Sequence, residues 1–114
     1  MNRELPKNIE AEKCLLGSMF WSREALQKGC EEVNKDIFYL ESHGKIFEAI
    51  QHLYTENTPV DMTSLTTYLI SIGKIKEVGG VEYLNEVVNS VATGASIKYY
   101  INLVSEKYTL RKLI

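Results

Sequence analysis

Apolar side chains recur along this chain at helical spacings, and no stretch shows the strict alternation that is typical of a half-buried strand. The most regular stretch opens at Ser42, and its apolar positions follow the spacing i, i+1, i+4, i+7 and i+8: Ile46, Phe47, Ile50, Leu53 and Tyr54. Charged and polar side chains occupy the opposite positions. This pattern predicts an amphipathic helix that begins at Ser42.

The segment from Pro59 to Leu84 predicts a hairpin of two helices. Asp61 is placed to cap the first of them, and the apolar spacing from Val60 to Leu65 is that of a hydrophobic staple. The first helix presents one apolar stripe and stops at a glycine: Met62, Leu65, Leu69, Ile72 and then Gly73. A turn at Gly79 and Gly80 starts the second helix, whose predicted apolar face is Val81, Leu84, Val88 and Val91.

Three further helices complete the pattern. The first is capped by Asn8, carries Glu10 and Glu12 near its positive end, and ends at residues 21–22. Its mid-helix Gly17 indicates a close approach by another helix. The second runs from about Arg23 to Val33 with Ser22 as its cap, and a loop with Phe38 follows it. The last begins at Ile97 with Ser96 as its cap.

The last helix is apolar on two sides. One stripe is Ile97, Tyr100, Ile101, Val104 and Tyr108, and the other is Tyr99, Leu103, Leu110 and Ile114. Two apolar sides imply two packing partners, and residues 110–114 contain no stop pattern. We therefore expect residues 1–114 to be one all-α domain of about six helices, cut from a longer protein.

Charge and composition narrow the function classes. The chain has 13 Lys and Arg against 15 Asp and Glu, a formal net charge of −2. A nucleic-acid-binding module usually shows a basic excess, so we expect no strong direct binding of nucleic acid. No apolar run approaches the roughly 20 residues of a membrane span, and the N-terminus lacks a signal-peptide core, so the expected location is the cytoplasm. Cys14 and Cys30 lack a zinc-ligand spacing and are expected to be buried thiols.

The sequence offers no arrangement that predicts catalysis, a cofactor site or a metal site. The Gly79-Gly80 pair has no GK[ST] sequence after it and is interpreted as a turn. His43 and His52 are expected on one helical face in structural roles, and the two carboxylates of the first helix point about 200° apart. Glu10 and Glu12 are therefore assigned to helix-terminus electrostatics. By its residues alone, the chain is interpreted as an interaction or scaffold module.

Five motifs in order resemble one family. They are similar to segments of the N-terminal domain of bacterial replicative DNA helicases, the DnaB family. The five motifs are residues 6–12 (PKNIEAE) with 15–17 (LLG), 38–47, 59–65 (PVDMTSL), 78–84 (VGGVEYL) and 97–114. The similarity covers nearly the whole chain. The chain departs from the family pattern in two places. Trp21 lies near the end of the first helix, and the small Val81 stands where relatives often carry a larger apolar residue.

The resemblance implies a helical head domain that oligomerises and docks partners. Heads of this family pair as dimers within a hexameric collar, which binds primase and in some cases a helicase loader. ATP and Mg would be cofactors of the full-length helicase, whereas this fragment would need none and would not be an enzyme. Candidate assembly residues are Asp61 and Val81, with plain capping and plain core packing as their alternatives. Candidates for the partner surface are Tyr99, Leu103, Leu110 and Arg111.

Two other hypotheses remain open at this point. The chain could be the helicase-binding domain of a primase or an unrelated helical adaptor, because primase C-terminal regions have a similar helical fold. It could also be a small helical DNA-binding regulator, although the net charge of −2 counts against that.

Overall fold

The computed structural model describes residues 4–114, which form six α-helices and one short 3₁₀ helix, with no strand in that range. The elements are α1 (Ile9–Ser18), α2 (Arg23–Glu32), η1 (Lys35–Ile37), α3 (Glu41–Thr55), α4 (Met62–Ser71), α5 (Gly80–Val88) and α6 (Ile97–Lys112). The predicted all-α architecture is confirmed. Only η1 was not anticipated, and it forms where the side chain of Asn34 accepts a hydrogen bond from the backbone of Asp36.

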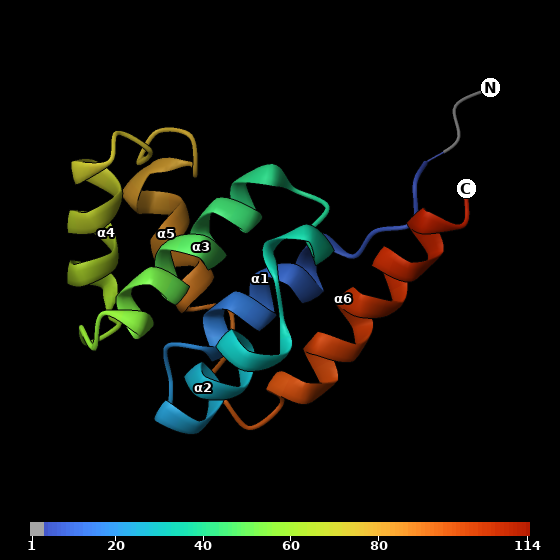
Figure 1. Cartoon of the computed structure of the whole chain (residues 1–114), viewed down its shortest axis with the longest axis horizontal. Helices are drawn as coiled ribbons and strands as arrows, with labels where there is room; N and C mark the ends of the chain where they lie inside the picture. The colour runs from blue at the N-terminus through green and yellow to red at the C-terminus, as the bar shows by residue number, and fades with distance from the viewer. Residues whose placement is uncertain (1–3) are drawn as a thin grey trace.

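Helix α1 lies at the centre of the molecule and packs against α2, α3, α5 and α6 (Figure 1). Helix α6 runs along one side, while α4 lies at the opposite end and contacts only α3 and α5. The largest fully buried apolar side chains come mostly from α1, α3, α4 and α5, with Met19 following α1 and Val78 preceding α5: Leu15, Leu16, Met19, Ile46, Phe47, Ile50, Leu65, Leu69, Val78 and Leu84. Ile97, Ile101 and Val104 of α6 join the same core. One core therefore extends from α6 to α4.

Three of the predicted helix caps are present. The side chains of Asn8 and Ser22 each accept a hydrogen bond from a backbone N–H three residues on, at 3.0 Å. Asp61 accepts from the Ser64 N–H at 2.8 Å, and Ser64 Oγ accepts from the Asp61 N–H at 3.0 Å, which completes a capping box. These side chains satisfy N–H groups that a helix start otherwise leaves unpaired.

One predicted helix start differs by one residue, and one predicted cap is wrong. Helix α3 begins at Glu41 rather than Ser42, and Leu40 in the cap position makes no side-chain hydrogen bond. Ser96 does precede α6, but its side chain makes no capping hydrogen bond either. At both starts a backbone carbonyl accepts a hydrogen bond: Leu40 from the N–H of His43 at 3.0 Å, and Ser96 from the N–H of Tyr100 at 3.2 Å.

The apolar face predicted for α5 is also partly wrong. Leu84 and Val87 are the buried residues, Val81 is 45% exposed, and Val91 lies beyond the end of the helix at Val88. The turn before α5 does form as predicted, because Gly79 and Gly80 have φ angles of +101° and +77°. Leu84 and Val87 thus form the buried face of α5, and Val81 in its first turn is left exposed to solvent.

Helix α6 has one buried and one open side, as its two stripes predicted. Ile97, Ile101 and Val104 are buried against the core. On the other stripe, Leu103 is half-buried, whereas Tyr99 and Leu110 are 61% and 38% exposed. The second packing partner expected for this helix is therefore not supplied by the described residues.

Candidate functional site

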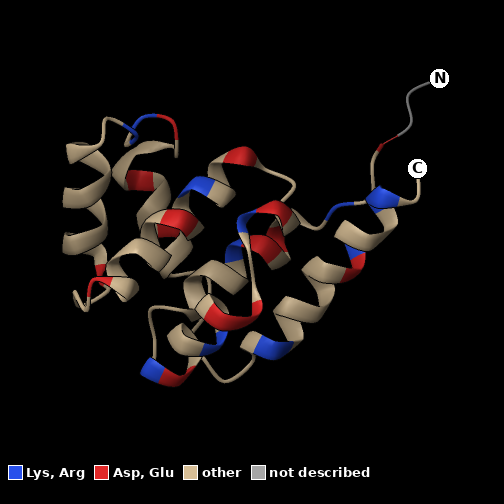
Figure 2. Cartoon of the chain, in the orientation of Figure 1, with Lys and Arg blue, Asp and Glu red and all other residues tan. Residues whose placement is uncertain are grey.

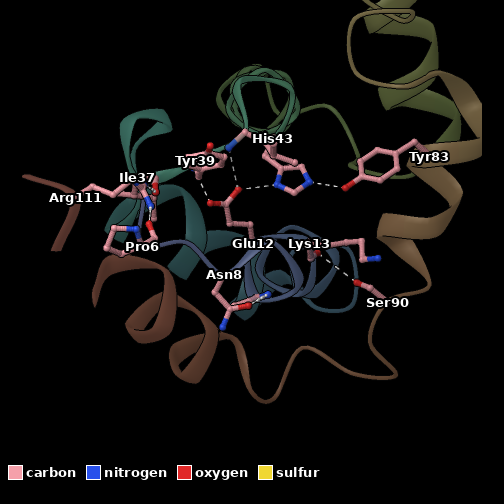
Figure 3. A network of polar contacts seen from close by, with 12 residues as sticks. Pro6, Asn8, Glu12, Lys13, Ile37, Tyr39, His43, Tyr83, Ser90 and Arg111 are labelled. Carbon is pink, nitrogen blue, oxygen red and sulfur yellow. Dashed lines mark hydrogen bonds and ion pairs between the residues drawn. The ribbon is translucent and has the colours of Figure 1, made fainter. Parts of the chain in front are cut away.

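A buried carboxylate lies at the centre of the molecule. Glu12 on α1 is only 1% exposed, and it accepts hydrogen bonds from the backbone N–H groups of Tyr39 at 2.6 Å and Leu40 at 3.4 Å. Its Oε1 also lies 2.8 Å from Nδ1 of His43, which is fully buried on α3 (Figure 3). A carboxylate can remain buried only when such donors replace water.

The second nitrogen of His43 is held by α5. Its Nε2 is hydrogen-bonded to the hydroxyl of Tyr83, and the two rings stack with centroids 5.8 Å apart. Burial raises the pKa of the Tyr83 hydroxyl above its ordinary value of 10.0, so this group keeps its proton at neutral pH. The contacts of Glu12, His43 and Tyr83 therefore join α1, α3 and α5.

The positions of these residues correct two predictions. Glu12 is a buried hydrogen-bond acceptor rather than a helix-terminus charge, whereas Glu10 is exposed and pairs with Lys13 at 3.0 Å. His43 and His52 lie on opposite sides of α3, because nine residues at about 100° each amount to two and a half turns. His52 is exposed and stacks on Tyr68 with centroids 4.4 Å apart.

At the opposite end of this network, Arg111 of α6 is bound within the fold. Its guanidinium donates hydrogen bonds of 2.9 Å to the carbonyl oxygens of Pro6 and Ile37. The same group lies 5.5 Å from the centre of the Tyr39 ring, within the range of a cation–π contact (Figure 3). Arg111 thereby ties the last turn of α6 to the N-terminal lead and to the segment that follows η1.

Helix α4 and the adjacent Val81 of α5 form an uncharged surface at one end of the molecule, between the exposed acids Asp61 and Glu82. No residue of α4 is charged (Figure 2), and a hollow of about 320 Å³ lies between its first two turns and Val81. The hollow is lined by Met62, Thr63, Thr66, Thr67 and Val81. We call these five residues the α4–α5 face. Asp61 caps the same end of α4, so the structure brings the two candidate assembly residues to one region.

A larger hollow of about 580 Å³ lies beside the N-terminal ends of α2 and α6. Trp21 lines it and is 47% exposed, and its indole N–H donates a 3.3 Å hydrogen bond to the carbonyl of Val88. Glu24, Lys28 and Lys98 also line it, and Glu32 pairs with both lysines nearby. Trp21 thus links the turn after α1 to the end of α5.

The candidate residues divide into two groups in space. Asp61 and Val81 lie at the α4–α5 end, whereas Tyr99, Leu103, Leu110 and Arg111 lie along α6 (Figure 1). The exposure of Val81 is inconsistent with the alternative of plain core packing, and Asp61 does act as a helix cap. The roles of all six in assembly or docking stay predictions.

The buried network itself was not predicted from the sequence. Glu12 belongs to the PKNIEAE motif, whereas His43 and Tyr83 belong to two of the other motifs. Nothing in their spacing shows that residues 31 and 40 positions apart in sequence are in contact. The apolar residues Leu15 and Leu16, three and four positions after Glu12, place this glutamate on the apolar side of the helix, which is the one pattern that indicates a buried acid.

Within residues 4–114, no group of three or more His, Cys, Asp or Glu side chains is arranged to hold a metal ion. None of the helices in that range has the length and apolar character needed to cross a membrane. Cys14 and Cys30 are free thiols and are half-buried rather than fully buried as expected. Burial raises the pKa of Cys30 to about 11.

Comparisons with known proteins agree on one family. The DnaB-like helicase N terminal domain matches residues 4–106. The replicative DNA helicase DnaC of Bacillus subtilis (strain 168) is 43% identical over 109 residues, and the replicative DNA helicase DnaB of Geobacillus stearothermophilus is 38% identical over 109 residues. Each alignment covers 96% of this chain and 24% of the relative, so the chain spans about a quarter of their length.

The fold agrees with a solved structure of the same family. The crystal structure of the N-terminal domain of DnaB helicase from Mycobacterium tuberculosis superposes with a TM-score of 0.91 at 32% identity, covering 96% of this chain and 80% of that one. These matches exclude the alternative assignments to a primase domain, an unrelated adaptor or a DNA-binding regulator. The chain belongs to the family of DnaB-like helicase N-terminal domains.

Proposed function

We propose that this chain is a head domain that pairs with a second copy through the α4–α5 face. The observation that carries the proposal is the exposed Val81 beside a helix without a single charge. An uncharged face can meet its own copy around a two-fold axis without placing like charges opposite each other. Apolar side chains exposed next to a hollow are also the type of surface that association buries.

Pairs of heads would assemble into a hexameric collar in a longer protein. In this proposal the collar presents a composite surface to primase, and in some organisms to a helicase loader. The open stripe of α6, with Tyr99, Leu103 and Leu110, supplies a second apolar surface for a neighbouring segment or partner. Arg111 contributes by fixing the end of α6 rather than by contacting a partner directly, because its guanidinium already binds Pro6 and Ile37.

The catalytic activity belongs to the longer protein in this proposal. The curated relatives are named replicative DNA helicases and are about four times as long as this chain. DNA unwinding driven by ATP and Mg, in the cytoplasm, would depend on residues outside the head. The head itself would take no cofactor and would not bind DNA strongly, in keeping with its net charge of −2.

The pairing is tested by sedimentation equilibrium of the 114-residue chain over a wide concentration range. We expect a monomer–dimer equilibrium that Val81→Asp abolishes. The variant should fold, because Val81 is the second residue of α5 and a carboxylate there interacts favourably with the positive end of the helix. Circular dichroism checks this point.

The matched control adds the same charge elsewhere. Ala92→Asp lies in the exposed loop before α6, away from the α4–α5 face, and should leave the dimerisation constant unchanged. A wild-type chain that is monomeric at every concentration would contradict pairing by the head alone. An equal loss of dimer in both variants would contradict the choice of face.

A further inference from the structure

The polar contacts of this molecule form one continuous path between two distant ends. From α5, the Tyr83 hydroxyl contacts His43, and His43 contacts Glu12 at 2.8 Å. Glu12 then accepts the Tyr39 N–H at 2.6 Å, and the ring of Tyr39 lies 5.5 Å from the guanidinium of Arg111. Figure 3 shows these groups in sequence across the core, from α5 on one side to Arg111 on the other.

Each step in the core of this path depends on the next, because water cannot take the place of a lost partner. Glu12 and His43 are 1% and 0% exposed. If the Tyr83 hydroxyl is removed, Nε2 of His43 is left buried without its partner, which costs the desolvation energy of that group. The ring can recover a partner only by turning, and turning withdraws Nδ1 from Glu12.

Tyr39 is the joint between the buried and the exposed parts of the path. Its backbone N–H points inward to Glu12, whereas its side chain is 36% exposed. Lys7 Nζ also lies 4.8 Å from the centre of the same ring, so residues from near both ends of the chain meet at Tyr39. Residues 38–40 are therefore docked on Glu12 on the inner side and held at the Tyr39 ring by Arg111 on the outer side.

We propose that this path is a coupling device in which the docked state of residues 38–40 links the position of α5 to the last turn of α6. Docked residues 38–40 keep Ile37 in place to accept its hydrogen bond from Arg111, and they keep the Tyr39 ring beneath the guanidinium. A change at α5 that disturbs Tyr83 shifts the segment towards release, and the end of α6 loses its attachment. The coupling operates within a single chain and does not depend on pairing.

The first test is hydrogen–deuterium exchange of Tyr83→Phe at a concentration where the chain is monomeric. Loss of one buried hydrogen bond should speed exchange of the Tyr39 and Leu40 amides by about tenfold, and exchange in the last turn of α6 should rise with it. Tyr68→Phe is the matched control, since it removes a tyrosine hydroxyl on α4 outside the path and should leave those amides unchanged.

The second test runs in the opposite direction, because a coupling free energy is reciprocal. Arg111→Ala should change the imidazole nitrogen shifts of His43 in NMR spectra, whereas Lys112→Ala, which removes a cation from the neighbouring position, should not. The proposal is overturned if Tyr83→Phe speeds exchange only within α5, or uniformly in all helices. It is equally overturned if Arg111→Ala leaves the His43 resonances in place.

Discussion

At the scale of single residues, the two glutamates of α1 have opposite roles although they are two positions apart. Glu10 lies in solvent and pairs with Lys13, whose pKa its hydrogen bond raises. Glu12 is enclosed and accepts hydrogen bonds from Tyr39, Leu40 and His43. Position on the helix surface, rather than distance from the helix start, decides what each carboxylate does.

This difference predicts unequal effects of the same substitution. Glu12→Gln replaces one acceptor oxygen by an NH₂ group that faces existing donors, and it should lower the free energy of unfolding by about 2–3 kcal/mol. Glu10→Gln removes only an exposed ion pair and should change it by less than about 0.5 kcal/mol. Urea denaturation measures both, and equal effects would show that Glu12 is no more than a helix-terminus charge.

A second residue-scale prediction concerns acid stability. Hydrogen bonds from Lys98 at 2.8 Å and Lys28 at 3.0 Å hold the pKa of Glu32 below its ordinary value of 4.5. Because the pKa is lower in the folded state, the stabilisation is present above pH 4.5 and is lost as pH falls through the folded value. Glu32→Gln should therefore be less stable than the wild type at neutral pH and equal to it in strong acid.

The control for this prediction is the neighbouring Glu31→Gln, since Glu31 is exposed and has no lysine within ion-pair distance among the described residues. Urea midpoints measured across the acid range should separate the two variants. A Glu32→Gln variant whose deficit persists unchanged below the folded pKa would argue for lost packing instead of a lost ion pair.

At the scale of elements, Gly17 allows a close contact between α1 and α5. A Cβ atom at Gly17 would lie 2.3 Å from the carbonyl oxygen of Val87 and 2.5 Å from Ser90 Oγ, so only glycine permits this approach. The single Ser90 hydroxyl proton is shared between the carbonyl oxygens of Val87 at 2.6 Å and Lys13 at 3.3 Å. The close approach that the mid-helix glycine indicated is thereby confirmed, and its partner is α5.

Gly17→Ala is predicted to destabilise the fold by about 1–3 kcal/mol, even though alanine is the better helix former by about 1 kcal/mol. The reason is that the added methyl group meets backbone atoms, which cannot move aside. Gly29→Ala on α2 is the matched comparison, because its methyl group would meet the flexible side chain of Met19. Thermal unfolding should show a clearly smaller loss for Gly29→Ala, and the reverse order would contradict this account of the α1–α5 contact.

The elements differ in how far the sequence determined them. Local patterns were sufficient for α4, because Asp61, Ser64 and Gly73 define its start and end within the segment itself. They were insufficient for the face of α5, because all four of Val81, Leu84, Val87 and Val88 are apolar, and only packing against α1 and α4 selects which are buried. The sequence places the start of α3 one residue late for a different reason, which is that no capping side chain marks it.

At the scale of the whole molecule, the buried network lay beyond sequence reasoning, because Glu12, His43 and Tyr83 come from three helices that meet only in the folded chain. What the sequence did predict was the surplus of apolar surface. It is distributed over two places, the α4–α5 face at one end and the stripe of α6 along the other side (Figure 1). A head with two such surfaces is suited to join one neighbour by each.

The central claim, that heads pair through the α4–α5 face, is tested most directly by a dilution series followed in two-dimensional ¹H–¹⁵N NMR spectra. We predict that concentration-dependent shifts cluster on the first two turns of α4 and the first turn of α5, around Met62, Thr66 and Val81. The resonances of α6 should stay in place. Shifts confined to Tyr99, Leu103 and Leu110, or no shifts at any concentration, would contradict the claim.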